Sequence, residues 1–290
     1  MSHPAGAIHP DTITIGGDLT VARLGFGAMR VCGRGAWGDP SDRKAAIALL
    51  RRVVERGVTL IDTADSYGPG TSESLIAEAL HPYPAGVVIA TKGGLLRPTA
   101  ARWDPDCRPA HLREACEASL RRLKIERIDL YQLHTVDPRV KLADSLGALV
   151  ELQRQGKIRH IGLSNVSVAQ LNEARKLATI VSVQNRYNLE DRDSDPVIDA
   201  CAAAGIAFLP WYPLAAGSLA QARTLDRVAA RYRVAGKAAS RAQIALAWLL
   251  KRSPVMAPIP GTGSVEHFEE NLAAREIALA DVDFAALANA

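Results

Sequence analysis

Short apolar runs recur along this 290-residue chain, and each ends in a polar or glycine-containing segment. Runs of this kind, rich in valine, isoleucine and leucine, are typical of strands that are buried on both faces. They predict strands at 24–27, 58–61, 87–90, 128–133, 158–163, 180–183, 206–209 and 255–259.

Between these runs, apolar residues recur at spacings of three and four, which predicts amphipathic helices. Ser41 can cap the first, which runs to about Arg56 and places Ala45, Leu49, Leu50 and Val53 on one side. Further helices are expected at about 72–80, 110–123, 142–155, 168–177, 195–204 and 240–250, with an insertion helix at 221–233, a final helical region, and a long polar loop at 95–109.

Strict alternation of strands and helices predicts a parallel sheet. Eight units of about 25 to 35 residues each favour a closed (β/α)8 TIM barrel, with an open doubly wound sheet as the alternative. Before the first unit, Thr12–Ile15, a glycine pair and Leu19–Val21 predict an N-terminal β-hairpin that caps one end of the barrel. No change of composition marks a linker, so a single domain over residues 1–290 is expected.

Polar or aromatic side chains stand where the apolar strands stop. In a parallel barrel the active site lies at these carboxyl ends. Each residue alone has an ordinary structural explanation, such as helix capping or a solvated charge, but their convergence on one face favours a site. The residues are Asp62, Lys92, His134, Asn165, Gln184 and Trp211.

The stretch from Gly57 to Gly70 carries a carboxylate at a strand end and, five residues on, Tyr67. A structural explanation, in which the carboxylate caps a helix and the tyrosine packs on its loop, is open for this stretch alone. An unperturbed tyrosine has a pKa of about 10. An ammonium from Lys92, balanced by Asp62, would lower that pKa, and His134 could donate a hydrogen bond to a substrate oxygen. This set lacks a reductant or nucleophile, and it suits protonation of a carbonyl while a hydride arrives from nicotinamide.

Composition excludes several other classes. The formal net charge is +4 with scattered arginines, so nucleic acid is not an expected partner. Apolar segments are too short to span a bilayer, and the N-terminus lacks the basic start and apolar core of a secretory signal. The spacing of the four cysteines is not that of a metal site, so no metal is expected; they are Cys32, Cys107, Cys116 and Cys201. They are expected to be reduced thiols in a cytoplasmic protein.

Several long segments, in order along nearly the whole chain, resemble the aldo-keto reductase family. They are GFGAM at 25–29, GVTLIDTADSYGPGTSESLIAEAL at 57–80, ATKGG at 90–94, DLYQLHTVDP at 129–138, QGKIRHIGLSN at 155–165, VSVQNRYN at 181–188, WYPLAAG at 211–217 and IPGTGSVEHFEEN at 259–271. Among family members, the segment TKGGLLRP resembles most the bacterial ones that include pyridoxal reductases.

The resemblance implies reduction of an aldehyde or ketone by a nicotinamide cofactor, with Tyr67 as proton donor in a tetrad of Asp62, Tyr67, Lys92 and His134. It implies NADPH as the preferred cofactor, with NADH possible. The residues expected at the cofactor are Met29, Asp62, Ser164, Asn165, Gln184, Trp211, Pro213, Leu214, Gly217, Ile259, Gly261, Thr262, Gly263, Ser264, His267, Glu270 and Asn271.

The 2′-phosphate end departs from the usual family pattern. Gly261 stands where many members have a lysine, and His267 where many have an arginine. The glycines still let a phosphate approach the backbone, and the helix that follows attracts anions. Cofactor binding is therefore expected, with a weaker preference for NADPH than is usual in the family.

The substrate pocket is expected in the loops, with Trp37, Trp103 and Tyr212 as aromatic walls; loop anchoring is an equal alternative for the two tryptophans. Pyridoxal is one candidate aldehyde, whereas Arg97 and Arg102 would favour an anionic carbonyl compound. Two other functions are open: a Schiff-base aldolase that uses Lys92, and a cofactor-binding regulator without catalysis. The sequence does not choose an oligomeric state.

Overall fold

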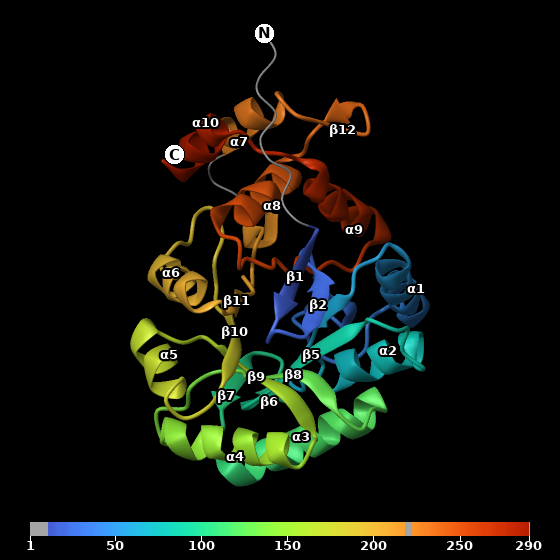
Figure 1. The fold of residues 1–290 in the computed structure, drawn as a ribbon. Helices are drawn as coiled ribbons and strands as arrows, with labels where there is room; N and C mark the ends of the chain where they lie inside the picture. Colours follow the sequence, from blue (N-terminus) through green and yellow to red (C-terminus); the bar gives the residue numbers. More distant parts are fainter. Residues whose placement is uncertain (1–10, 218–221, 290) are drawn as a thin grey trace.

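The computed structural model of the protein describes residues 11–217 and 222–289. Seven parallel strands form a curved sheet in the order β11-β10-β9-β8-β5-β4-β3, and Figure 1 shows them inside a ring of helices. The strands are β3 (Phe26–Gly27), β4 (Leu60–Asp62), β5 (Val88–Gly93), β8 (Ile128–Leu133), β9 (Ile158–Ser164), β10 (Ile180–Gln184) and β11 (Ala207–Phe208).

The segment predicted as the eighth strand closes the barrel, although it forms no regular strand. Phe208 N donates to Val255 O at 2.8 Å on one side, and Gly25 N donates to Pro258 O at 2.9 Å on the other. Only an isolated bridge, between Phe208 and Met256, is present. Pro258 and Pro260 lack the N–H that a ladder needs, which explains the irregular pairing. The predicted (β/α)8 barrel is confirmed.

The surrounding helices follow the predicted order. They are α1 (Arg43–Glu55), α2 (Thr71–Leu80), α3 (Pro109–Leu123), α4 (Leu142–Arg154), α5 (Val168–Ala174), α6 (Asp195–Ala204) and α8 (Arg241–Arg252). Two predictions for α1 were wrong: Asp42 rather than Ser41 caps the helix, and Ala46 rather than Ala45 is buried. Asp42 lies one residue nearer the helix, so its carboxylate reaches Ala45 N at 2.9 Å.

The predicted N-terminal hairpin is confirmed as β1 (Thr12–Ile15) paired with β2 (Leu19–Ala22). Figure 1 shows it in the centre of the helical ring. Its buried residues Ile15, Leu19 and Val21 pack in one cluster with inward-facing strand residues. Asp18 in its turn pairs with Arg159 and with His160, at the start of β9. The hairpin therefore closes the end of the barrel opposite the strand ends that carry the polar residues.

The long segment 95–109, expected to be a polar loop, contains a second antiparallel hairpin. It is formed by β6 (Leu95–Thr99) and β7 (Arg102–Pro105). The remaining elements are η1 (Ala28–Val31), η2 (Ala215–Gly217), α7 (Ala222–Ala229), β12 (Arg233–Val234), β13 (Lys237–Ala238), α9 (Val265–Leu272), η3 (Ala273–Glu276) and α10 (Asp281–Ala288). The expected insertion helix therefore ends at Ala229, and its predicted first residue lies outside the described residues.

The four cysteines are buried and unpaired, and burial raises the pKa of the Cys32 thiol to about 11. No helix within the described ranges is long and apolar enough to cross a membrane.

Candidate active site

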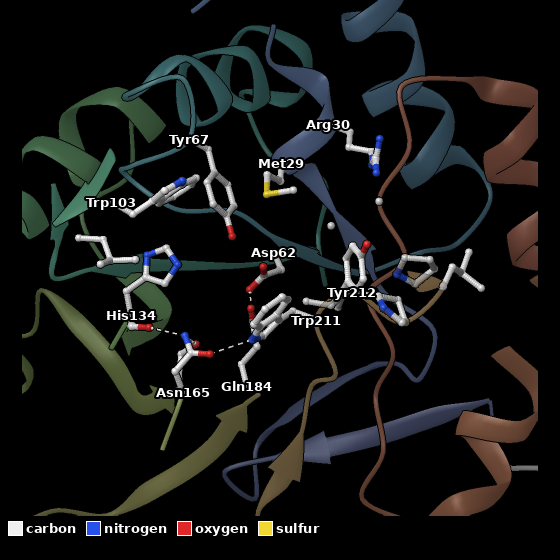
Figure 2. Close-up of a pocket in the computed structure, with 18 residues that line it drawn as sticks. Met29, Arg30, Asp62, Tyr67, Trp103, His134, Asn165, Gln184, Trp211 and Tyr212 are labelled. Atoms are coloured by element: carbon white, nitrogen blue, oxygen red, sulfur yellow. Dashed lines mark hydrogen bonds between the residues drawn. The ribbon is translucent and has the colours of Figure 1, made fainter. Parts of the chain in front are cut away.

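A cavity of about 440 Å³ opens at the carboxyl ends of the strands. Figure 2 shows side chains from most of the predicted segments turned toward it. Fourteen of the predicted residues line it: Met29, Asp62, Tyr67, Trp103, His134, Ser164, Asn165, Gln184, Trp211, Tyr212, Pro213, Leu214, Ile259 and Gly261. Four lining residues were not predicted: Gly27, Arg30, Leu95 and Pro260.

Lys92 lies beneath the cavity floor on β5 and is completely buried. Its Nζ donates to Asp62 Oδ1 at 2.6 Å, to Thr63 O at 2.8 Å and to Tyr67 Oη at 3.4 Å. Burial would lower the pKa of Lys92, but the charge and hydrogen bond of Asp62 outweigh it and raise that pKa. Lys92 is therefore a fixed ammonium whose three protons are all committed.

Asp62, at the end of β4, is held by two amides as well as by Lys92. Gln184 Nε2 donates to Asp62 Oδ2 at 2.8 Å, and Gln132 Nε2 donates to the same oxygen at 3.1 Å. These hydrogen bonds offset the cost of burying the carboxylate. Gln132 was not among the predicted site residues; the signal that could have identified it is a polar residue inside the apolar run of β8.

Tyr67 presents its hydroxyl to the cavity from the loop before α2, as Figure 2 shows. The Lys92 ammonium lies 5.0 Å from the centre of the Tyr67 ring. Burial raises the pKa of Tyr67, and the charge of Lys92 opposes that rise. The pKa of Tyr67 is therefore raised, whereas the sequence predicted that Lys92 would lower it. The prediction left out the cost of burying the phenolate, which outweighs the effect of the ammonium. Tyr67 is therefore protonated at neutral pH, as a proton donor must be.

His134 follows β8 and packs edge-on against Tyr67, with ring centres 5.9 Å apart. Burial and the charge of Lys92 hold the pKa of His134 well below its usual value, so its imidazole is neutral. Its Nδ1 lies 3.3 Å from Ser66 Oγ, and its carbonyl oxygen accepts from Asn165 Nδ2 at 3.0 Å.

Two residues of the wall adopt left-handed backbone conformations. Asn165 has a φ of 57° and Tyr212 a φ of 60°. For a tyrosine such a conformation costs about 1–3 kcal/mol and persists only where surroundings enforce it. The Asn165 carboxamide joins two sides of the site, because its Oδ1 also accepts from Trp211 Nε1 at 3.0 Å (Figure 2). The Trp211 indole is thereby fixed at the cavity wall.

The wall near Gly261 fits a phosphate-bearing cofactor. A Cβ on Gly261 would lie 2.5 Å from Gly27 O, and one on Gly27 would lie 2.7 Å from Ile259 O. Only glycines allow the two backbones to approach this closely, and neither residue adds a side chain to the cavity wall. Arg30 lines the cavity beside it, and among the described residues its guanidinium has no hydrogen-bond or ion-pair partner. These features suit an anionic group.

Several expected cofactor residues do not line the cavity: Gly217, Thr262, Gly263, Ser264, His267, Glu270 and Asn271. Most continue from Gly261 into α9, whose first turn is capped by Ser264 Oγ accepting from His267 N at 3.3 Å. They therefore lie outside the cavity, and their expected contact with the cofactor stays a prediction.

Trp37 and Arg97 lie outside the cavity lining. The Arg97 guanidinium is buried, 3.6 Å from the centre of the Trp103 ring and 5.4 Å from that of Trp37. It donates to backbone oxygens of Gly35, Ala36, Ser66 and Ala100. Arg97 thus bonds the protein backbone and does not line the cavity, so its position does not support the expectation that it attracts an anionic substrate. Exposed Arg102 pairs instead with Asp104.

A closed parallel barrel with a buried Asp–Lys pair, a tyrosine and a neutral histidine at its mouth defines a carbonyl-reducing oxidoreductase. The model of the Aldo/keto reductase family matches residues 23–290, and the chain belongs to this family.

Known relatives agree with this assignment. The chain is 44% identical to pyridoxine 4-dehydrogenase of Escherichia coli over 282 residues, which cover 93% of this chain and 95% of that one. It is 49% identical to the uncharacterized oxidoreductase C215.11c of Schizosaccharomyces pombe over 272 residues, covering 93% and 87%. A crystal structure of a Klebsiella pneumoniae aldo-keto reductase in complex with NADPH aligns with a TM-score of 0.81 at 27% identity, covering 96% and 94%.

Proposed function

We propose that this chain reduces an aldehyde to an alcohol with NADPH, and that Tyr67 gives the proton. The observation that carries the proposal is the Tyr67 hydroxyl, which faces the cavity and lies 3.4 Å from the buried Lys92 ammonium. Bound NADPH supplies the hydride. As negative charge builds on the carbonyl oxygen, Tyr67 transfers its proton to that oxygen, and the fixed charge of Lys92 stabilises the phenolate left behind.

The other residues of the site prepare this proton transfer. Asp62, held by Gln132 and Gln184, keeps Lys92 in place. His134, being neutral, adds a hydrogen bond to the substrate without adding charge. Asn165 and Trp211 form the wall along which the nicotinamide would lie.

The preference for NADPH over NADH rests on Arg30 and the glycine wall. Arg30 is a cation without a partner among the described residues, and it lines the cavity beside Gly261. It offsets the missing lysine at position 261. The Arg30→Gln variant should bind NADPH about tenfold more weakly and NADH less so, by quenching of tryptophan fluorescence. An equal loss for both cofactors would place Arg30 at the pyrophosphate that they share.

Pyridoxal is the proposed substrate. The likeness to pyridoxine 4-dehydrogenase supports it, as do two aromatic walls of the cavity, Trp103 and Tyr212. The Schiff-base aldolase is disfavoured, because a nucleophilic lysine must lose its charge and all three protons of Lys92 are donated. A regulator without catalysis is disfavoured by the complete tetrad.

The deciding experiment is a titration of NADPH and NADH followed by a panel of aldehydes at the absorbance of the reduced cofactor. Binding of NADPH with oxidation on addition of pyridoxal supports the proposal. Binding without turnover of any aldehyde would favour the regulator, and binding of neither cofactor would refute the reductase.

A further inference from the structure

The residue before the proton donor makes a contact that the catalytic scheme does not use. Ser66 Oγ lies 3.3 Å from His134 Nδ1. Both residues are buried, with 2% and 6% of their surfaces exposed. Ser66 belongs to the loop that carries Tyr67, so this contact joins that loop to His134. Tyr67 and His134 are the two side chains proposed to contact the substrate oxygen.

The state of His134 makes this contact informative. A neutral imidazole carries one N–H, on either Nδ1 or Nε2. The nitrogen that carries it is a donor and the other is an acceptor, so the tautomer decides what the cavity receives. Nδ1 faces Ser66. Nε2 has no partner among the described residues and is not among their enclosed, unpaired polar atoms, so it is open to the cavity that His134 lines.

The buried serine hydroxyl discriminates between the two tautomers. Across the described part of the chain, His134 Nδ1 is the one hydrogen-bond partner found for Ser66 Oγ. If Nδ1 carried the proton, it would donate to Oγ, and the hydroxyl hydrogen would stay buried without an acceptor. If Nε2 carries it, the hydroxyl donates to Nδ1 and both groups are satisfied. Leaving a buried donor unpaired costs free energy, so the second arrangement is favoured.

We propose that Ser66 is a positioning residue that fixes His134 as the Nε2–H tautomer. The cavity then receives two donors, Tyr67 O–H and His134 Nε2–H. Both can bond one carbonyl oxygen as its negative charge grows, which is the arrangement of an oxyanion hole. Figure 2 shows the two rings on the same side of the cavity. This role in catalysis rests on the proposed reduction of a carbonyl, whereas the tautomer does not.

The tautomer is read directly by nitrogen NMR of the full chain labelled with ¹⁵N-histidine. The chain has seven histidines, and the signals lost in His134→Gln assign the ring. Wild type should show a protonated Nε2 and a bare Nδ1 from pH 6 to 8. Ser66→Ala should give a mixture of tautomers, and Ser66→Thr, which keeps the hydroxyl, should restore the wild-type spectrum. A protonated Nδ1 in wild type would overturn the proposal.

Kinetics test the consequence for catalysis. Ser66→Ala should lower kcat about tenfold with an unchanged Kd for NADPH, and Ser66→Thr should recover most of the loss. Ser145→Ala is the matched control, because Ser145 is also 2% exposed and donates to Cys107 O at 2.8 Å, away from the site. If wild type turns over aldehydes and Ser66→Ala matches it in kcat and spectrum, this proposal alone fails. If no aldehyde is turned over, the reductase fails while the NMR still reports the tautomer.

Discussion

Lys92 Nζ lies 2.6 Å from Asp62 Oδ1, and both residues are buried. A buried ion pair of this kind contributes little net stability, since desolvation offsets the attraction. Its effect falls on Tyr67, whose hydroxyl is the third partner of the ammonium. The pair holds a positive charge beside the site of proton transfer, in surroundings that screen it weakly.

Tyr67→Phe should abolish carbonyl reduction and leave cofactor binding intact, because it removes only the proton donor. General acid catalysis contributes about 10²- to 10⁴-fold, and kcat should fall by at least that much. The measurement is kcat beside the Kd for NADPH. Tyr83→Phe is the control, since its hydroxyl bonds Leu123 O at 2.8 Å, far from the cavity. Unchanged turnover in Tyr67→Phe would refute its assignment.

Lys92→Met should lower kcat by about 10²-fold or more, because the phenolate loses its stabilising charge. That charge lowers the pKa of Tyr67, so its removal should move the alkaline limb of the rate–pH profile to higher pH. A profile identical in shape to that of wild type would give Lys92 another role.

The same substitution leaves Asp62 as an unpaired buried charge, which can unfold the protein. The double variant Asp62→Asn with Lys92→Met removes both charges together. It should recover the melting temperature lost in Lys92→Met and remain inactive. Recovery of activity as well would show that the single variant failed for want of folding alone.

Arg97→Met should loosen the β6–β7 hairpin, since the guanidinium joins four backbone oxygens to the face of Trp103. Trp103 lines the cavity, 6.3 Å from the Tyr67 ring centre. We expect KM for an aromatic aldehyde to rise about tenfold and KM for a small aliphatic aldehyde to change little. Arg102→Met, on the same hairpin but exposed, is the matched control. Equal changes for both aldehydes would contradict a role in shaping the substrate wall.

The residues at the strand ends could be predicted from the sequence. An apolar run that stops at Asp62, Lys92 or His134 can be recognised without knowing which distant residues it contacts. Gln132 could not be assigned in the same way. It lies inside β8, and its importance comes from a contact with Asp62, 70 positions earlier on β4, with β5 between the two strands.

Each prediction that the structure corrected has an identifiable physical cause. At 255–259 the apolar pattern predicts a strand, but the prolines at 258 and 260 remove the donors that regular pairing requires. In 95–109 the polar composition concealed a hairpin that is held by stacking of Arg97 on Trp103. The burial that raises the pKa of Tyr67 comes from packing, which the sequence pattern does not report.

Asp65 gives a prediction about stability rather than catalysis. Burial and the charge of Glu73 raise its pKa to about 8, and its Oδ1 is enclosed without a partner in the described structure. An unfolded aspartate has a pKa of about 3.9. Between pH 4 and 8 the folded state therefore keeps a proton that the unfolded state has lost, and the free energy of unfolding falls as pH rises through that range.

An asparagine side chain does not ionise in this pH range, so the free energy of unfolding of the Asp65→Asn variant should not show this decrease. Its melting temperature should exceed that of wild type at pH 8.5 by a few degrees, at roughly 2–4 °C per kcal/mol, and the difference should shrink toward pH 4.5. Thermal unfolding at several pH values measures it, with exposed Asp193→Asn as the control. A difference that does not vary with pH would mean that Asp65 is ionised in the folded protein, with a partner that neutralises it.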